Sequence, residues 1–295
     1  MNLLEVSHIS KQYSSFTLQD ISFSLPAGYI MGYIGQNGAG KTTTLNIITH
    51  LIHGNSGSVS IDHVQFKDDP IAYRDLIGYI GDSSYFPEDL NVKNIRTILK
   101  DFYPSFHPEK YDGYVKKWQL PQKDKIKSFS RGMKVKLMFA SVLSRETRLL
   151  VLDEATNGLD PMMRREILML LQDYISDGKR SVLFSTHILE DLEQIADYIF
   201  FIDQGRKIFC DTKEELTESY LLVKGGLQDL TPALAGSLIG IEQNSFGFEA
   251  LYPVKSGAVL PSGLLTAKPS IDQIIVHFIL KADETPTSIG RVATI

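Results

Sequence analysis

Several features that mark other classes of protein are scarce or missing in this 295-residue chain. Its single cysteine, Cys210, excludes an internal disulfide, and one lone thiol is compatible with a reducing compartment. Cys210 follows Phe209 in an apolar run, so we expect a buried, unreactive thiol. No stretch of about 18 apolar residues occurs, so we expect that a partner chain must supply any membrane-spanning segments.

Positive charge is also scarce. The chain has 30 Lys and Arg against 35 Asp and Glu, whereas general nucleic-acid binding needs a basic surface, so we expect no nucleic-acid partner. The N-terminus alternates from Leu3 to Val6 like a strand and lacks the basic and then apolar segments of a signal peptide. Hydrophobic residues make up 43%, enough for a complete core in one large domain or two ordinary ones.

What the sequence does contain is a phosphate-loop pattern, G-x-x-x-x-G-K-[ST], followed by one more threonine. Its members are Gly35, Gln36, Asn37, Gly38, Ala39, Gly40, Lys41, Thr42 and Thr43. Glycines allow the backbone to curl so that consecutive N–H groups point at phosphate oxygens. Lys41 supplies a mobile cation for the phosphates, and the Thr42 hydroxyl is a candidate Mg²⁺ ligand. A glycine-rich turn that matches by chance is the alternative.

The residues around this loop support a nucleotide site. Residues 29–34 form an apolar run that predicts a buried strand leading into the loop. Residues 43–51 are apolar at helical spacing and predict the helix that leaves it. The positive N-terminus of that helix would face the phosphates.

Strand and helix patterns alternate along most of the chain. Residues 3–25 predict antiparallel strands, and residues 91–144 predict helices separated by prolines. Asp160-Pro161 predicts the start of another helix, because it combines an N-cap with proline at the first position. Further strands are predicted at 59–61, 77–80, 149–152, 181–185, 198–202 and 207–209, and a helix at 187–196. The pattern predicts an α/β fold: a parallel core with antiparallel additions and a helical insertion.

The composition changes after about residue 217, where charges become sparse although the segment is too apolar for a disordered linker. A short strand is predicted at 246–251. Ser270 and Gln273 fit a capping box, and apolar residues at helical spacing follow it. We interpret residues 218–281 as a small α+β domain closed by this helix, with a loose tail from Asp283.

Two carboxylates, Asp153 and Glu154, end an apolar strand. In a phosphate-loop ATPase, Asp153 would hold Mg²⁺, and Glu154 would lie near the attacking water as general base. Adjacent acids at a strand end can also be ordinary surface residues. The phosphate loop upstream favours the catalytic interpretation.

Four further residues, Ser130, Arg131, Gly132 and Met133, precede an apolar helix. A serine and free backbone N–H groups at a helix N-terminus can bind an anion. Taken alone, the segment is an ordinary N-cap.

The order of these segments resembles the ATP-binding cassette (ABC) ATPase family. After the phosphate loop come the Ser130 segment, Leu152-Asp153-Glu154-Ala155-Thr156, Asn157-Gly158-Leu159-Asp160 and Ser185-Thr186-His187. The resemblance covers about residues 2–215, and the ordered set of motifs is highly specific. It implies an ABC nucleotide-binding domain at 1–217, with a helical insertion at about 84–145, and a C-terminal accessory domain at 218–295.

The resemblance also implies ATP and Mg²⁺ as cofactors and roles for single residues. Tyr13 would stack on adenine, and Ser130 to Met133 would contact ATP on the opposite subunit of a homodimer or pseudo-dimer. Asn157 to Asp160 would cross the dimer interface, and His187 would be the switch histidine near the γ-phosphate. From the residues alone, His187 could instead cap a helix, and Tyr13 could be a half-buried strand residue.

Two departures from the family pattern stand out. The usual signature, Leu-Ser-Gly-Gly-Gln, is replaced by Phe129-Ser130-Arg131-Gly132-Met133, which keeps the serine and the second glycine. Where a glutamine usually follows Ile77 to Ile80, this chain has Gly81-Asp82. By resemblance, Asp82 would reach Mg²⁺ and the attacking water. The alternative is that Asp82 is a surface acid.

The signature style, Ser-x-Gly-Met-Lys, and the C-terminal helix resemble cassettes of bacterial exporters with ABC-2-type membrane subunits. Exporters of amphipathic peptides, including phenol-soluble modulins and bacitracin-type antibiotics, belong to that group. The resemblance therefore implies an ATPase subunit held at the cytoplasmic face of the membrane by a permease. Two alternatives are a soluble ABC ATPase in assembly or DNA maintenance and a non-enzymatic nucleotide-gated module.

Two aromatic residues, Tyr85 and Phe86, follow Asp82 closely. Exposed aromatics beside a nucleotide-sensing loop would form a docking surface for a membrane subunit. The alternative is that both rings pack within the helical insertion.

Overall fold

The computed structural model describes residues 1–256, 260–261 and 263–284. The chain forms two compact units, Met1–Cys210 and Asp211–Ile295. The boundary predicted after residue 217 falls inside α8 (Lys213–Ser219), within the second unit. Across the described ranges, no helix combines the length and the apolar character that a membrane crossing requires.

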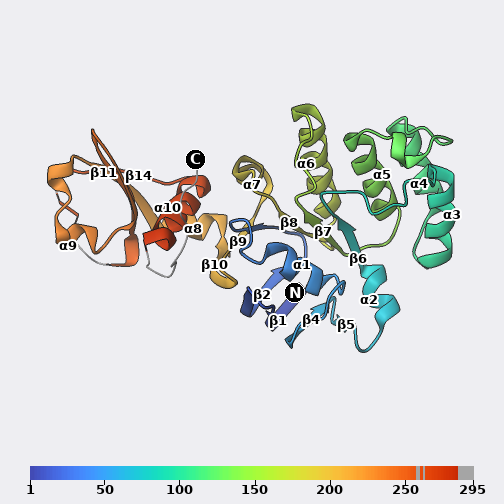
Figure 1. The fold of residues 1–295 in the computed structure, drawn as a ribbon, viewed down its shortest axis with the longest axis horizontal. Helices are drawn as coiled ribbons and strands as arrows, with labels where there is room; N and C mark the ends of the chain where they lie inside the picture. Colours follow the sequence, from blue (N-terminus) through green and yellow to red (C-terminus); the bar gives the residue numbers. More distant parts are fainter. Residues whose placement is uncertain (257–259, 262, 285–295) are drawn as a thin grey trace. The chain divides into compact units, whose positions relative to one another are not determined.

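A six-stranded sheet forms the centre of the first unit (Figure 1). Its order is β10 (Arg206–Thr212), β9 (Tyr198–Asp203), β3 (Ile30–Ile34), β8 (Ser181–Ser185), β7 (Leu149–Asp153) and β6 (Ile77–Ile80). The strands from β9 to β6 pair in parallel. β3, β7 and β8 are buried along their whole length, which explains their unbroken apolar sequences. The predicted α/β fold with a parallel core is confirmed.

The carboxyl ends of parallel strands meet at one edge of a sheet. At this edge β3 leads into residues 35–43, β7 ends at Asp153, and β8 leads to His187. β6 reaches the same edge just before Asp82. The topology therefore gathers several of the predicted site segments, which are far apart in the sequence.

A second, antiparallel sheet has the order β2 (Thr17–Pro26), β1 (Asn2–Gln12), β4 (Ser56–Ile61) and β5 (Val64–Gln65). It shares one hydrophobic core with the central sheet and with α1 (Lys41–Ile48). Phe23 of β2 lies 4.8 Å from Phe200 of β9, and Tyr33 of β3 stacks on the same ring at 4.6 Å, between ring centroids. This packing fixes α1, and with it the loop before α1, against both sheets.

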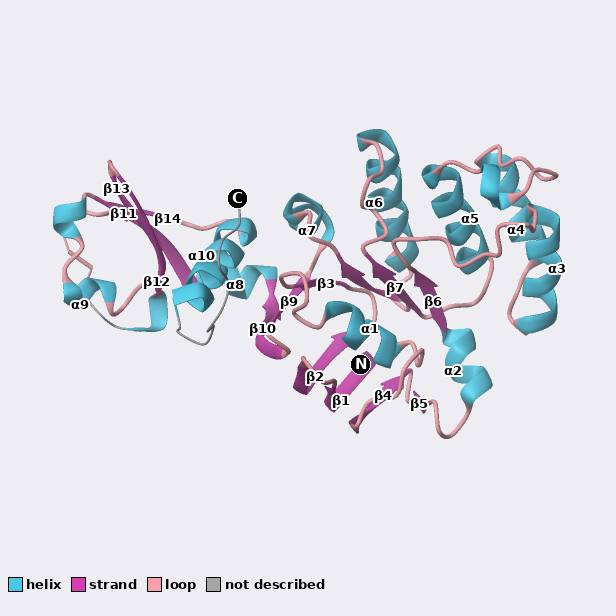
Figure 2. Ribbon diagram, viewed as in Figure 1, coloured by secondary structure: helices cyan, strands magenta, loops and turns pink. Residues whose placement is uncertain are grey.

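The helical insertion follows β6 and consists of α3 (Val92–Phe102), α4 (Pro108–Lys117), η1 (Ile126–Ser128) and α5 (Arg131–Leu143), shown in Figure 2. Asn91 and Asn94 form a capping box at the start of α3. α5 packs closely on β6, where a Cβ at Gly78 would lie only 2.1 Å from Val142. The insertion is thus anchored to the sheet through α5.

Two further helices of the first unit pack against each other, and the first of them also packs on β8. They are α6 (Pro161–Ile175) and α7 (Leu189–Ile195). The predicted N-cap of α6 is present, because the Asp160 carboxylate accepts a 3.0 Å hydrogen bond from the Met163 N–H. The short helix α2 (Pro70–Leu76) was not predicted, although Asp69 caps it and Pro70 occupies its first turn.

The second unit has its own four-stranded sheet with the order β12 (Ile239–Asn244), β13 (Gly247–Pro253), β11 (Tyr220–Gly225) and β14 (Leu265–Ala267). Its remaining elements are η2 (Leu227–Asp229), α9 (Pro232–Ala235), η3 (Val254–Ser256) and α10 (Ile271–Glu284). The capping box predicted for α10 forms between Ser270 and Gln273. The first residues of the predicted tail belong to α10, and residues 285–295 lie outside the described part of the chain.

Two expectations about local structure are wrong. The helix after the phosphate loop ends at Ile48 rather than near Leu51, whose side chain is 61% exposed. Cys210 is half-buried rather than buried, and it packs against the edge of the core of the first unit.

Candidate functional site

The loop of residues 35–43 has the curled backbone that the sequence predicts. A Cβ at Gly35 would lie 2.3 Å from the carbonyl oxygen of Ile202, which only glycine avoids. Gly40 has a φ of 111°, in a region that favours glycine, and directly precedes the first residue of α1. The N-terminal N–H groups of α1 thus adjoin this loop, as an anion site requires.

Lys41 lies beneath this loop and is only 6% exposed. Its Nζ donates hydrogen bonds to the carbonyl oxygens of Gly35 at 2.7 Å and Gln36 at 3.2 Å. Burial lowers the pKa of Lys41, and the negative charges of Glu154 and Asp153 oppose that shift. The cation is therefore held inside the loop and beside both carboxylates.

Asp153 supplies a carboxylate that suits a metal ion. The residue is 7% exposed, and its Oδ1 is buried with no hydrogen-bond partner. Burial is the main cause that raises the pKa of Asp153, and the Thr42 hydroxyl opposes it. A carboxylate and a hydroxyl oxygen are ligands that Mg²⁺ accepts alongside phosphate oxygens. The residues present therefore fit the predicted ion.

Glu154 is the residue at which the other segments meet. One carboxylate oxygen lies 3.9 Å from Lys41 Nζ. The other accepts a 2.7 Å hydrogen bond from Asn157 Nδ2 and lies 3.6 Å from His187 Nδ1. The backbone of Glu154 has a φ of 54°, in the left-handed region that non-glycine residues rarely occupy. Backbone strain of this kind gathers at functional sites.

His187 follows β8 and keeps 58% of its side chain exposed. It does not cap the next helix, because α7 has Ile188 at its N-cap position with no side-chain bond. The Thr186 hydroxyl instead accepts a hydrogen bond from the Ile188 N–H. The imidazole is thus free to turn toward a ligand beside Glu154.

The segment from Ser130 to Met133 lies at the start of α5. The Ser130 hydroxyl caps the helix by accepting from the Met133 N–H at 3.3 Å. Among the residues that the structure describes, no hydrogen bond or ion pair joins this segment to the phosphate loop. The Ser130 hydroxyl is thus engaged with the first turn of its own helix.

Within the part of the chain that the structure describes, Tyr13 and Asp82 make no hydrogen bond or ion pair with the residues around Glu154. Tyr13 follows the end of β1 rather than lying within a strand, and its ring is 43% exposed beside Phe16. Asp82 is exposed in the bend after β6. Burial raises the pKa of Tyr79 to about 12, and the negative charges of Asp153 and Asp82 add to that shift.

A groove of about 440 Å³ lies between the sheet and the helical insertion. Aromatic and aliphatic side chains line it, and its charged lining residues are Arg74, Arg145 and the titratable His50, with no carboxylate among them. Tyr85 is 49% exposed and lines the groove, whereas Phe86 is 8% exposed. The expectation that both rings are exposed is wrong for Phe86, which packs within the insertion next to Tyr85.

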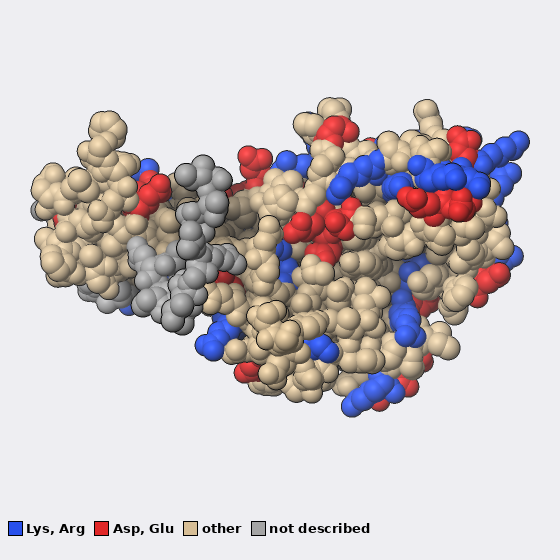
Figure 3. Space-filling view, in the orientation of Figure 1, with Lys and Arg blue, Asp and Glu red and all other residues tan. Residues whose placement is uncertain are grey.

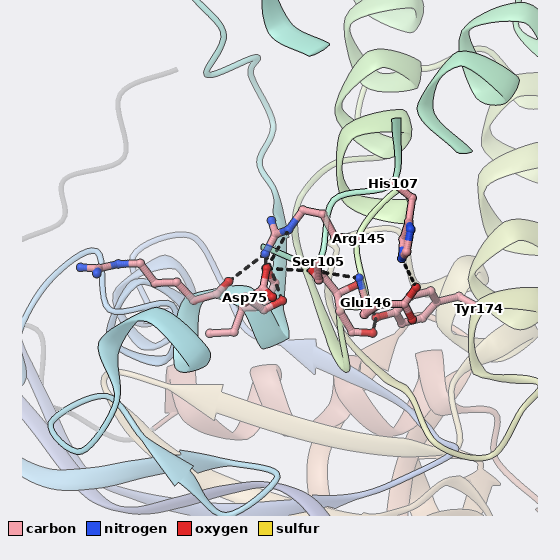
Figure 4. Close-up of polar contacts among 9 residues, drawn as sticks. Asp75, Ser105, His107, Arg145, Glu146 and Tyr174 are labelled. Atoms are coloured by element: carbon pink, nitrogen blue, oxygen red, sulfur yellow. Dashed lines mark hydrogen bonds and ion pairs between the residues drawn. The ribbon is translucent and has the colours of Figure 1, made fainter. Parts of the chain in front are cut away.

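Arg145, at the base of this groove, was not predicted. Its guanidinium donates to the carbonyl oxygens of Arg74, Asp75 and Ile77 at 2.8 to 3.2 Å, and it lies 3.5 Å from the centre of the Tyr103 ring. Its Nε is buried with no hydrogen-bond partner. Figure 4 shows the polar network that runs from Arg145 to Asp75, through Ser105 to Glu146, and on to His107.

Charges on the helical insertion are mixed rather than of one sign. The face drawn in Figure 3 carries basic and acidic side chains side by side over this region. Exposed ion pairs join Arg96 to Asp112 and Lys110 to Glu146. Surface pairs of this kind contribute about 0 to 1 kcal/mol each, so they matter more for solubility than for stability.

Comparison with known proteins gives consistent matches. The ABC transporter family profile matches residues 18–157. The lantibiotic transport ATP-binding protein SrtF of Streptococcus pyogenes is 31% identical over 235 residues, covering 74% of this chain and 96% of the relative. The ABC transporter ATP-binding protein YtrB of Bacillus subtilis is 27% identical, covering 91% and 92%.

Solved structures agree. The ATP-binding subunit of an ABC transporter superposes with a TM-score of 0.67 at 28% identity, covering 73% of this chain and 92% of that one. An ATP-binding cassette solved as a dimer in a post-hydrolysis state with ADP and phosphate gives a TM-score of 0.63 at 21% identity, covering 71% and 98%.

Proposed function

Because this chain belongs to the ATP-binding proteins of ABC transporters, we propose that it drives the export of an amphipathic compound through a separate permease. Membership makes the chain an ATP-binding ATPase subunit of a transporter. The export direction, the cargo and the roles of single residues are the proposal. The observation that carries the catalytic part is the convergence of Lys41, Asn157 and His187 on Glu154.

Each residue of the site has a chemical task in this proposal. Lys41 exchanges its carbonyl partners for phosphate oxygens, and the N–H groups of residues 35–43 bind the same phosphates. Asp153 and Thr42 would hold Mg²⁺, which polarises phosphate oxygens when bound. Glu154 accepts the proton of the attacking water, and His187, which lies 3.6 Å from Glu154, would contact the γ-phosphate.

The working unit is proposed to be a dimer with composite sites. Ser130 to Met133 present a helix N-terminus that makes no hydrogen bond or ion pair with the phosphate loop of the same chain, as far as the described residues go. A second copy would bring this segment to the ATP bound on the first. A relative of the same fold was solved as a dimer with ADP and phosphate, which supports the arrangement. Tyr13 supplies an exposed ring for the adenine.

The proposed permease contact is the groove lined by Tyr85 and Arg145. Its aromatic lining and the absence of a carboxylate among its lining residues favour an amphipathic segment with acidic side chains. Such a contact would hold the chain at the cytoplasmic face of the membrane.

The proposed cargo class comes from relatives. SrtF is named for lantibiotic transport. A second relative, LnrL of Bacillus subtilis, is named for linearmycin resistance and is 30% identical over 224 residues. An amphipathic peptide or antibiotic is the cargo most consistent with both names. The relatives offer no support for a soluble role in assembly or DNA maintenance.

The experiment is affinity purification of the tagged chain from its native cells in mild detergent, followed by ATPase assays. We expect a polytopic membrane protein to accompany the chain and to change its turnover. A Tyr85→Ala chain tests the groove and should recover less of that protein, whereas Glu109→Gln, on the exposed surface of α4, is the control and should recover as much as the unchanged chain. Recovery of only soluble partners would contradict the proposal that a permease binds this chain through the groove.

A further inference from the structure

A buried carboxylate behind the catalytic residues joins segments that belong to different motifs. Asp191, in the first turn of α7, is 1% exposed. Its Oδ1 accepts a 2.5 Å hydrogen bond from Arg164 Nε, and its Oδ2 accepts a 3.3 Å hydrogen bond from the Thr156 hydroxyl. Arg164 lies in the first turn of α6, and Thr156 lies in the loop after Glu154. One side chain thus holds α6, α7 and the loop between β7 and α6.

Two of these segments, the loop between β7 and α6 and the start of α7, adjoin residues of the proposed catalytic site. Thr156 is two residues after Glu154 and directly precedes Asn157, which contacts the Glu154 carboxylate. Asp191 is four residues after His187, and its N–H donates to the Ile188 carbonyl oxygen, so it is fixed to the start of α7. The contact between Asp191 and Thr156 therefore ties the segment that follows His187 to the segment that follows Glu154.

The backbone at Glu154 needs such support. Its φ of 54° is costly for a residue with a side chain, and a conformation of this kind persists only where surrounding contacts over-determine it. The N–H of Glu154 donates to the Ser185 carbonyl oxygen, and its own carbonyl accepts from Asn157 N–H. Thr156, two residues later, is 1% exposed, and its hydroxyl is held by the hydrogen bond to Asp191.

Arg164 offsets the cost of burying the Asp191 carboxylate. Burial raises the pKa of Asp191, while the Arg164 hydrogen bond and charge lower it again. Arg164 is 25% exposed and also lies 3.5 Å from Glu190. A buried charge persists only when it is paired and its remaining lone pairs are used, and here Arg164 and Thr156 use both oxygens.

We propose that Asp191, held by Arg164, is a positioning residue that fixes the Glu154–His187 geometry through Thr156. Glu154 and His187 touch the reacting groups, whereas Asp191 acts only through its neighbours. This inference rests on the catalytic roles proposed above. It adds a structural link between the loop at the dimer interface and the helix behind the switch histidine.

The test uses isosteric changes at Thr156, which are less disruptive than removing a buried charge. Thr156→Val keeps the shape and removes the hydroxyl, so kcat should fall about ten- to hundredfold because small misplacements of catalytic groups are costly. The dissociation constant for ATP, measured with a fluorescent analogue, should stay within twofold. Thr156→Ser restores the hydroxyl and should restore kcat.

Variants at the other two corners complete the test. Asp191→Asn and Arg164→Gln should lower kcat in the same way, and a double change with Thr156→Val should be no worse than the stronger single change. Tyr174→Phe is the control, because it removes a hydroxyl from a similarly buried pair with Thr147, remote from the phosphate loop. It should lower the melting temperature without the kcat effect.

The outcomes separate this inference from the proposed function. Normal kcat in Thr156→Val, with Glu154→Gln inactive, would overturn the positioning role and leave the catalytic assignment intact. A loss of kcat in Tyr174→Phe that matches the loss in Thr156→Val would also overturn it, since stability alone would then explain the effect. Normal turnover in Glu154→Gln would instead overturn the proposed role of Glu154 as the base, on which this inference rests.

Discussion

The Asn157 amide donates a 2.7 Å hydrogen bond to the Glu154 carboxylate. Asn157 is the first residue of the loop expected to cross between subunits, and Glu154 is the expected general base. Movement of the crossing loop on dimer closure would therefore act directly on the base. If both expected roles hold, the chemistry and the subunit contact would share this hydrogen bond.

Glu154→Gln tests the base. Gln cannot take a proton from water, so we expect turnover to fall by about 10²- to 10⁴-fold while ATP binding persists. ATP that is bound and not hydrolysed should hold two chains together, which size-exclusion chromatography would detect. Glu109→Gln, on the exposed surface of α4, is the matched control. Turnover at the wild-type rate in Glu154→Gln would show that the base lies elsewhere.

Mixed dimers test the composite site. Lys41→Ala removes the cation of one phosphate loop, and Ser130→Ala removes the cap of one α5 helix, so each pure variant should be nearly inactive. A mixture should regain activity, because one of the two sites in a mixed dimer has both residues intact. The measurement is ATPase rate against mixing ratio. The idea fails if the Ser130→Ala chain alone is fully active, or if no mixture exceeds its parents.

Asp82 is the sharpest departure from the family pattern, and we predict that it engages only in the metal-loaded, closed state. Its exposed position is compatible with that view but also with an ordinary surface acid. The added charge near Asp153 and Glu154 should make loop insertion depend more steeply on Mg²⁺. Asp82→Asn should therefore flatten the dependence of ATPase rate on Mg²⁺ concentration. An unchanged titration, with unchanged stimulation by the permease, would identify a surface acid.

Tyr85 and Phe86 should now behave differently. Phe86 is buried, so Phe86→Ala should lower the free energy of unfolding by about 3 to 5 kcal/mol, as measured by urea denaturation. Tyr85 is half exposed in the groove, so Tyr85→Ala should weaken permease binding while basal ATPase activity and unfolding change little. Equal loss of stability in both variants would mean that the two rings serve the core alone.

The cap of α2 gives a stability prediction outside the site. Asp69 accepts hydrogen bonds from the Ile71 and Ala72 N–H groups. Asp69→Ala should therefore cost about 1 kcal/mol of unfolding free energy, and Asp69→Ser should cost less because serine is also a good cap. Chemical denaturation of both variants measures the difference, and equal stabilities would show that the cap is dispensable.

The parts of the site that the sequence predicts are contiguous motifs attached to strands. The loop of residues 35–43, Asp153-Glu154 and His187 each follow an apolar run, and parallel pairing of those runs brings them to one edge. Asp69-Pro70 has the same pattern as Asp160-Pro161, an N-cap followed by proline, so the start of α2 is also marked in the sequence.

Contacts between distant segments have no such signal. Arg145 binds backbone carbonyls about 70 residues earlier in the chain, and a carbonyl carries no mark of its partner in the sequence. Asp191 reads as one more acid in an acidic helical turn, and only the fold shows that it is buried against Thr156. The burial of Phe86 depends on how α3, α4 and α5 pack together. Periodicity does not determine that packing, so the expectation of an exposed ring was wrong.

Arg145 also has a mechanical consequence. Its guanidinium is fixed to three carbonyl groups at the end of α2 and the start of β6, while its flat face lies on Tyr103 at the end of α3 in the insertion. A stacked ring can turn and slide against a guanidinium plane, whereas the three hydrogen bonds cannot turn without breaking. If the insertion rotates against the sheet during a transport cycle, the hydrogen bonds of Arg145 to the backbone would stay in place. The Tyr103 ring would then turn or slide over the guanidinium.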